Sequence, residues 1–201
     1  MHYEVLFLFL IAAVLLTLSP GPDYLLVITK SVAEGWGAAS RFSLGLVCGL
    51  FLHTALVVVG VGTLVTNDPQ WLFFVKCIGA VYLLYIAFQA WRAPKIQLQE
   101  KQPQYHGNFR TGFVMNITNP KVLLFFLSFF PGFLFHDQWS EPFQFAILGL
   151  LFILQALFIF LSTAFLIGKL QRKLNFTSQF QYWNQLQALL FIGIAILLLF
   201  Y

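Results

Sequence analysis

Residues 5–29 read VLFLFLIAAVLLTLSPGPDYLLVIT, an apolar run that is interrupted at residues 19–23. A helix needs roughly 20 apolar residues to cross the hydrocarbon of a bilayer, and this run is long enough. Within the interruption, Pro20 and Pro22 lack a backbone N–H, and Gly21 permits a tight turn. The stretch therefore predicts a membrane-spanning helix that is broken near its centre.

The whole chain has the composition of a membrane protein. Of its 201 residues, 60% are hydrophobic and only 9% are charged, and the mean hydropathy is +0.83. A soluble domain carries roughly 25% charged residues, so the charges here are too few to cover a surface in water. The apolar runs are continuous, whereas the strands of a membrane barrel alternate over about ten residues. We therefore predict an all-α membrane protein in a lipid bilayer.

Six apolar runs are expected to span the membrane as helices. They cover residues 5–29, 42–66, 71–91, 113–135, 143–168 and 186–201. The fourth run resembles the first, because it is interrupted between Asn116 and Lys121 and contains a helix-breaking proline, Pro120. Helices one and four of the six are therefore predicted to be broken.

Basic residues predict the orientation in the membrane. If the six helices alternate in direction, nine basic residues lie on one side: Lys30, Arg41, Arg92, Lys95, Lys101, Arg110, Lys169, Arg172 and Lys173. The opposite connections, residues 67–70 and 136–142, contain no Lys or Arg. Because Lys and Arg concentrate in cytoplasmic loops, both termini are predicted on the periplasmic side of a bacterial inner membrane. The chain starts without a basic n-region, so we expect the first run to be retained.

The two halves of the chain are predicted to form an inverted repeat within a single transmembrane domain. A polar cytoplasmic loop, residues 93–110, separates residues 1–92 from residues 111–201. With three helices in each half, the second half enters the membrane from the opposite side. Aligning Pro22 with Pro120 sets PDYLLVI beside PKVLLFF. Secondary transporters often contain such repeats, and their solute sites lie at broken helices in corresponding positions.

The same alignment pairs Asp23 with Lys121, two ionisable residues inside apolar runs. A lone charge in hydrocarbon costs about 3 kcal/mol on insertion scales, so we expect a partner or a wet cavity. Asp23 suits an ammonium group and Lys121 a carboxylate, and Asn116 and Asn119 add amide donors and acceptors. Together they would match an amino acid. Two alternatives are a structural salt bridge and a coupling proton on Asp23, because burial penalises a charged carboxylate.

These motifs resemble those of the LysE/RhtB family of lysine exporters and homoserine/threonine-resistance carriers. The resemblance covers essentially the whole chain and rests on Ser19-Pro20-Gly21-Pro22-Asp23, the glycine-spaced second run, Phe109, Gly112, Asn116 and Asn119-Pro120-Lys121. It implies secondary-active export of amino acids or related metabolites from the bacterial cytoplasm, driven by a proton or sodium gradient. Many members have Asn in place of Asp23, so a proton or cation role for the acid is not general to the family.

Gly45 and Gly49 form a GxxxG motif, and His53 continues the same face of the second helix. Such glycines usually serve close helix packing, here either within the fold or between protomers of a homo-oligomer. His53 is either a hydrogen-bonded structural residue or part of the solute path.

Several other classes of protein lack support in the sequence. No P-loop, HExxH or GxSxG is present, and the histidines and cysteines lack metal-ligand spacing. We therefore expect no enzyme activity, cofactor or metal. The basic residues are scattered rather than clustered, which argues against nucleic-acid binding. The alternatives that stay open are an exporter of an inorganic cation and a non-transporting membrane scaffold or partner subunit.

Overall fold

The computed structural model describes residues 3–19, 21–61, 69–92, 108–170 and 183–200. All regular secondary structure in these ranges is helical, which confirms the predicted all-α class for the described part of the chain. The helices are α1 (Tyr3–Leu18), α2 (Pro22–Ala33), α3 (Trp36–Leu56), α5 (Pro69–Arg92), α6 (Phe109–Ile117), α7 (Pro120–Phe129), α8 (Glu141–Leu170) and α9 (Trp183–Phe200). A π-helical turn, η1 (Val57–Val61), extends α3, and a 3-10 turn, η2 (Phe130–Phe133), extends α7.

The described helices include two to four candidate membrane spans. Two helices are long and apolar enough to cross a membrane, Trp36–Gly60 and Glu141–Lys169. Two bent pairs qualify if each pair counts as one span: α1 with α2, bent by 56°, and α6 with α7, bent by 51°. Shorter apolar helices cover Cys77–Arg92 and Asn184–Leu197. Both bends lie at the two interruptions that the proline-containing motifs predict.

Helix α3, which contains the start of the second predicted apolar run, starts earlier than hydropathy predicts, at Trp36 rather than at residue 42. Gly35 directly precedes it with φ of 84°, a left-handed conformation that favours glycine. The chain therefore turns at Gly35, and the helix begins at once, whereas hydropathy detects only its apolar part.

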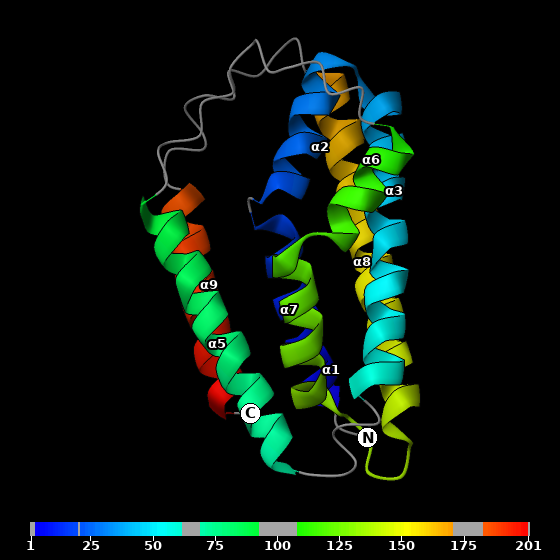
Figure 1. The fold of residues 1–201 in the computed structure, drawn as a ribbon. Helices are drawn as coiled ribbons and strands as arrows, with labels where there is room; N and C mark the ends of the chain where they lie inside the picture. Colours follow the sequence, from blue (N-terminus) through cyan, green and yellow to red (C-terminus); the bar gives the residue numbers. More distant parts are fainter. Residues whose placement is uncertain (1–2, 20, 62–68, 93–107, 171–182, 201) are drawn as a thin grey trace.

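The helices form two flanks around the broken pairs (Figure 1). On one flank α3 packs against α6 and α8, and on the other α5 packs along α9. Helix α1 packs against α8, and α7 packs against α5. The two breaks, between α1 and α2 and between α6 and α7, lie at similar heights in the bundle (Figure 1).

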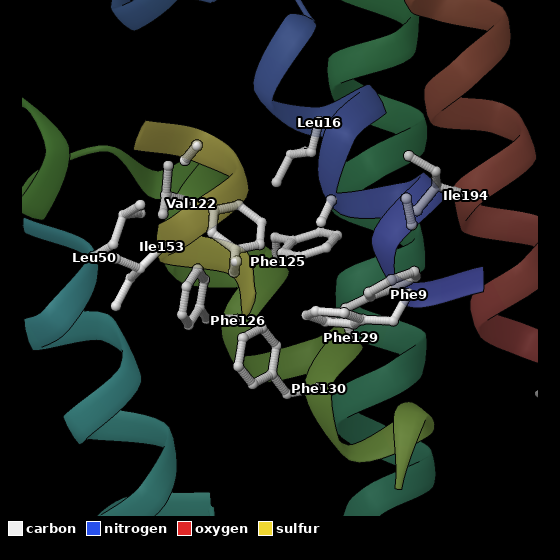
Figure 2. Close-up of a cluster of buried hydrophobic side chains, with 14 of the residues drawn as sticks. Phe9, Leu16, Leu50, Val122, Phe125, Phe126, Phe129, Phe130, Ile153 and Ile194 are labelled. Atoms are coloured by element: carbon white, nitrogen blue, oxygen red, sulfur yellow. The ribbon is translucent and has the colours of Figure 1, made fainter. Parts of the chain in front are cut away.

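A cluster of phenylalanines holds α7 in the bundle (Figure 2). Phe126 stacks on Phe130 with ring centroids 4.4 Å apart, and Phe125 stacks on Phe129 at 4.5 Å. The ring of Phe9, from α1, meets the edge of Phe130 at 5.3 Å. Each such pair contributes about 0.5–1.5 kcal/mol beyond its buried area. The cluster therefore fixes α7 and, with it, the helix start that follows the second break.

Small residues bring α3 and α6 into close contact within one chain. A Cβ at Gly45 would overlap the main chain of Phe109, and one at Gly112 would overlap the main chain of Phe42. A Cβ at Gly49 would lie 2.6 Å from Oδ1 of Asn116. The three glycines therefore let the two backbones approach, and Gly49 makes room for the Asn116 side chain.

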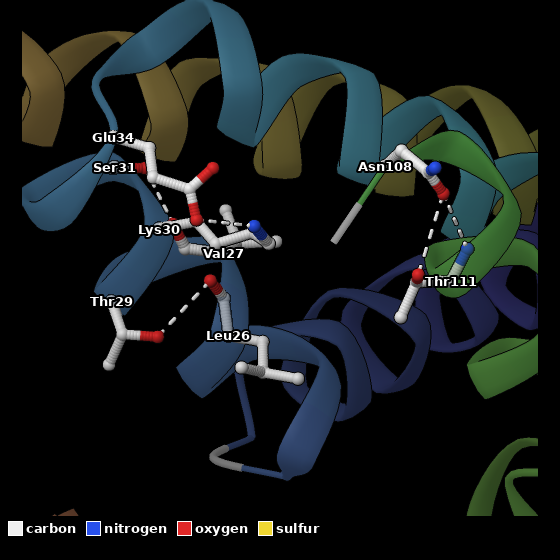
Figure 3. Close-up of polar contacts among 8 residues, drawn as sticks. All are labelled: Leu26, Val27, Thr29, Lys30, Ser31, Glu34, Asn108 and Thr111. Atoms are coloured by element: carbon white, nitrogen blue, oxygen red, sulfur yellow. Dashed lines mark hydrogen bonds and ion pairs between the residues drawn. The ribbon is translucent and has the colours of Figure 1, made fainter. Parts of the chain in front are cut away.

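Polar contacts stabilise the ends of α2 and α6 that lie farthest from the breaks (Figure 3). Lys30 is 3% exposed, and its Nζ lies 2.7 Å from Oε1 of Glu34, the C-cap residue of α2. Asn108 caps α6, because its Oδ1 accepts from the Thr111 amide at 3.2 Å. Each contact joins a helix to its own cap residue, so it stabilises that helix end locally.

Candidate functional site

Both helix breaks end at a proline that starts a new helix. Helix α2 begins at Pro22 after an extended Gly21, and α7 begins at Pro120 after an extended Asn119. Proline fits the first position of a helix, where an amide would have no intrahelical partner. Pro20, the other predicted breaking residue, lies outside the described residues. The half-helices α2 and α7 therefore bring their electropositive N-termini to the middle of the bundle.

Asn119 connects the two breaks. Its Nδ2 donates to Oδ2 of Asp23 at 2.7 Å, and its Oδ1 accepts from the Lys121 amide at 3.0 Å. Asp23 is 9% exposed and Asn119 is 7% exposed, so water barely reaches this contact. One side chain therefore caps α7 and holds the carboxyl group of α2.

Lys121 also reaches across to the first break. Its Nζ donates to the main-chain carbonyl of Ser19 at 3.2 Å and lies 5.5 Å from the ring centroid of Phe191 on α9. A Cβ at Gly21 would lie 3.3 Å from the same Nζ, so a residue without a side chain suits that position. Within the described residues, Asp23 and Lys121 do not form an ion pair with each other. The direct salt bridge considered from the sequence is therefore absent.

An open cavity lies between the breaks, and its empty space of about 350 Å³ includes open solvent at its mouth. Its polar lining comes from Thr17, Ser19, Asp23, Tyr24, Asn116 and Lys121. Its apolar lining comes from Leu16, Leu50, Val122, Phe152, Ala156 and Phe160. The cavity thus brings together Asp23, Asn116 and Lys121, while Asn119 holds Asp23 beside it.

Three oxygens at this cavity are buried and lack a hydrogen-bond partner among the described residues. They are Ser19 Oγ, Asp23 Oδ1 and Asn116 Oδ1. An unsatisfied buried polar group costs about 1–3 kcal/mol, so proteins rarely gather several without a reason. Three such acceptors beside one ammonium group are typical of a site that binds a polar ligand.

Sequence reasoning missed the contributions of Thr17, Tyr24 and Phe191. Thr17 and Tyr24 lie within about two turns of the first break. This position is the only feature of the sequence that marks them as candidate site residues. Thr17 Oγ1 accepts a hydrogen bond from Gln155 Nε2 at 2.9 Å, which ties the first break to α8. Phe191 lies in the apolar stretch of α9 that begins at Ala188, so nothing in its sequence context marks it.

His53 lies behind the cavity rather than in its wall. Its Nε2 is 3.1 Å from the main-chain oxygen of Asn116, and the residue is 1% exposed. The Asn116 side chain fits against Gly49, one turn before His53 on α3. Helix α3 therefore positions both the backbone and the side chain of Asn116.

The arrangement suits a ligand that carries both charges. Asp23 offers a carboxyl oxygen, Lys121 offers an ammonium group, and neutral amide and hydroxyl groups line the same cavity. No group of three His, Cys, Asp or Glu residues that could hold a metal ion occurs within the part of the chain that the structure describes.

Comparison with known proteins gives a consistent picture. The model of the LysE type translocator family matches residues 14–201. The homoserine/homoserine lactone efflux proteins of Salmonella typhi and Salmonella typhimurium LT2 are each 32% identical over 201 residues, with 98% of this chain and 97% of the relative covered. An uncharacterized membrane protein of Vibrio cholerae is 30% identical over 208 residues, with 98% of each chain covered. No solved structure matches the chain.

Proposed function

Because this chain belongs to the LysE type translocator family, we propose that it is a secondary carrier that exports amino acids or closely related metabolites across the bacterial inner membrane. The family and its efflux relatives are named as transporters rather than enzymes. Export of amino-acid-related compounds follows from this membership. The observation that carries the finer proposal is the cavity between the two breaks, which Asp23 and Lys121 both line.

The site recognises the two ends of an amino acid separately. Asp23 Oδ1 has no partner among the described residues, so it is free to accept from an α-ammonium group. Lys121 Nζ donates only to a main-chain carbonyl in this arrangement, and a carboxylate is a stronger, charged acceptor. A bound solute would therefore draw Lys121 away from Ser19 and loosen one of the two contacts between the breaks.

Alternating access is the mechanism that a two-fold arrangement of the halves would allow. If residues 1–92 and 111–201 are inverted repeats, α3 corresponds to α8 and α6 corresponds to α1. The packing of α3 on α6 then has its counterpart in the packing of α8 on α1. Both contacts occur, and the exchanged partners α3 with α8 and α5 with α9 also pack together. This packing supports two halves that rock around the central cavity, and the basic residues on one side of the six predicted spans support periplasmic termini. An ion gradient, of protons or of sodium, drives the cycle.

Counterflow in proteoliposomes tests the proposal. Vesicles are preloaded with a mixture of unlabelled amino acids that includes homoserine, and entry of each labelled compound is followed. Wild type is compared with Lys121→Ala and with Lys169→Ala, which removes an exposed lysine near the end of α8. We expect entry with wild type and Lys169→Ala and none with Lys121→Ala.

Two results would contradict the proposal. Entry that persists in folded Lys121→Ala protein would remove Lys121 from the solute site. No entry of any amino acid with folded wild type would favour an inorganic cation as the cargo, or a scaffold that transports nothing.

A further inference from the structure

His53 is a buried titratable residue that the proposed solute site does not use. Its Nε2 lies 3.1 Å from the Asn116 main-chain oxygen. Its Nδ1 is buried and has no hydrogen-bond partner in the described ranges. The ring lies near that of Phe126, with centroids 5.7 Å apart and the ring planes tilted by 42°.

The contact with Asn116 fixes the chemistry of the ring. A carbonyl oxygen can only accept, so Nε2 must carry a hydrogen and donate it. In the neutral ring, Nδ1 is then an acceptor with a free lone pair. A proton bound at Nδ1 would convert it into a donor that also lacks a partner here. The observed arrangement therefore accommodates neutral His53, and a protonated ring requires an arrangement in which Nδ1 gains an acceptor or water.

The element that links His53 to the solute is Asn116. Its main-chain oxygen accepts from His53 and also from the Asn119 amide at 3.0 Å, at the point where α6 ends. Its side chain lines the cavity, and its Oδ1 lacks a partner. A shift of the ring of His53 would therefore move the second break and a wall of the solute cavity together.

No charged side chain in the described part of the chain forms a hydrogen bond or ion pair with His53. The elements that pack against α3 are α2, α6, α7, α8 and η1. Their charged residues, together with Tyr24, are Asp23, Lys30, Arg110, Lys121, Glu141 and Lys169, and Glu34 directly follows α2. Of these, Asp23, Tyr24 and Lys121 line the same cavity as Asn116, and the others lie near the far ends of their helices. The hydrogen bond to the Asn116 main-chain oxygen is therefore the described contact that connects His53 to the solute cavity.

We propose that His53 is the proton-binding residue that couples export to the proton gradient. Nδ1 takes up a proton from the periplasmic side in one arrangement of the halves and releases it to the cytoplasm in the other. One proton thus enters through His53 for each solute that leaves. The inference rests on the proposed function, because it needs Asn116 to line a solute cavity.

His53→Gln separates this role from a structural one. The glutamine amide can keep an N–H donor toward the Asn116 carbonyl but cannot bind a proton at neutral pH. His136→Gln is the matched control, because His136 lies in the segment between α7 and α8 and stacks on Trp139 with centroids 4.4 Å apart. Each protein is reconstituted and tested with labelled homoserine in two assays, namely counterflow without an ion gradient and accumulation driven by a pH gradient at several values of pH.

We expect His53→Gln to retain counterflow, to lose accumulation driven by the pH gradient, and to lose the pH dependence of its transport rate. His136→Gln should match wild type in both assays. Accumulation by His53→Gln at the wild-type level would overturn the inference, as would a sodium gradient that drives wild type when a pH gradient does not. Loss of counterflow in folded His53→Gln would also overturn it, since His53 would then only position Asn116. Absence of counterflow in wild type would instead refute the proposed function.

Discussion

Removal of the Asn119 side chain tests whether the contact between the two breaks holds the site together. Asn119→Ala deletes two hydrogen bonds, the cap on the Lys121 amide at 3.0 Å and the 2.7 Å contact with Asp23. Loss of a helix cap costs about 1 kcal/mol. A hydrogen bond to a charged group contributes about 1.5–3 kcal/mol in soluble proteins. Hydrogen bonds between membrane helices average about 0.6 kcal/mol and reach about 1.7, because unfolded helices in lipid find other partners. We take the membrane values and expect a total of about 1.6–2.7 kcal/mol.

Asn108→Ala is the control for the capping part of this effect. Asn108 caps α6 through a 3.2 Å bond from the Thr111 amide, but that bond stays within one helix. We expect it to reduce the free energy of unfolding by about 1 kcal/mol. Unfolding in mixed micelles with increasing denaturing detergent gives both values. The account of the site is refuted if Asn119→Ala loses no more stability than Asn108→Ala, or if the effects of Asn119→Ala and Asp23→Ala add without coupling.

Three further predictions concern packing, the connection between α7 and α8, and orientation. Gly49→Ala should lower the free energy of unfolding by about 1–3 kcal/mol, because the added Cβ would lie 2.6 Å from Asn116 Oδ1. Gly193→Ala is the control and should not destabilise the protein, because no atom lies within 4 Å of a Cβ at that position. Gln144→Ala should lower the free energy of unfolding by about 2–4 kcal/mol and speed hydrogen exchange at the Phe135 amide, because the Gln144 side chain forms hydrogen bonds with four backbone groups. Gln138→Ala serves as a near-neutral control. In intact cells, a membrane-impermeant thiol reagent should label Asp137→Cys but not Arg110→Cys, and the reverse pattern would invert the topology.

Local features of the sequence predict the helices and the two breaks. Apolar runs, prolines and glycines act on the backbone where they stand, so Pro22 and Pro120 mark the starts of α2 and α7 without any knowledge of the fold. The same holds for the set of polar residues at the breaks, because a charge or amide in an apolar run needs a polar environment.

The partners of these residues could not be predicted, because they depend on how the halves pack. The pairing of Asp23 with Asn119 rather than Lys121 depends on distances between residues 96 positions apart. The contact of Lys121 with the Ser19 carbonyl also depends on the break in α1, which leaves carbonyls at that helix end without an amide partner. Which face of α3 meets α6 is likewise a property of the packed helices, although the glycine spacing marks that face.

The most direct test of the central claim compares how homoserine and homoserine lactone compete with the counterflow entry of labelled homoserine lactone, which does not need Lys121 to enter because it lacks a carboxylate. Both compounds carry an ammonium group, but only homoserine has a free carboxylate. Loss of one partner of a buried charge pair costs about 2–5 kcal/mol, so Lys121→Ala should weaken competition by homoserine by about 30-fold or more. Competition by the lactone should change little. Equal weakening of both compounds, or of neither, would contradict the assignment of Lys121 to the carboxylate.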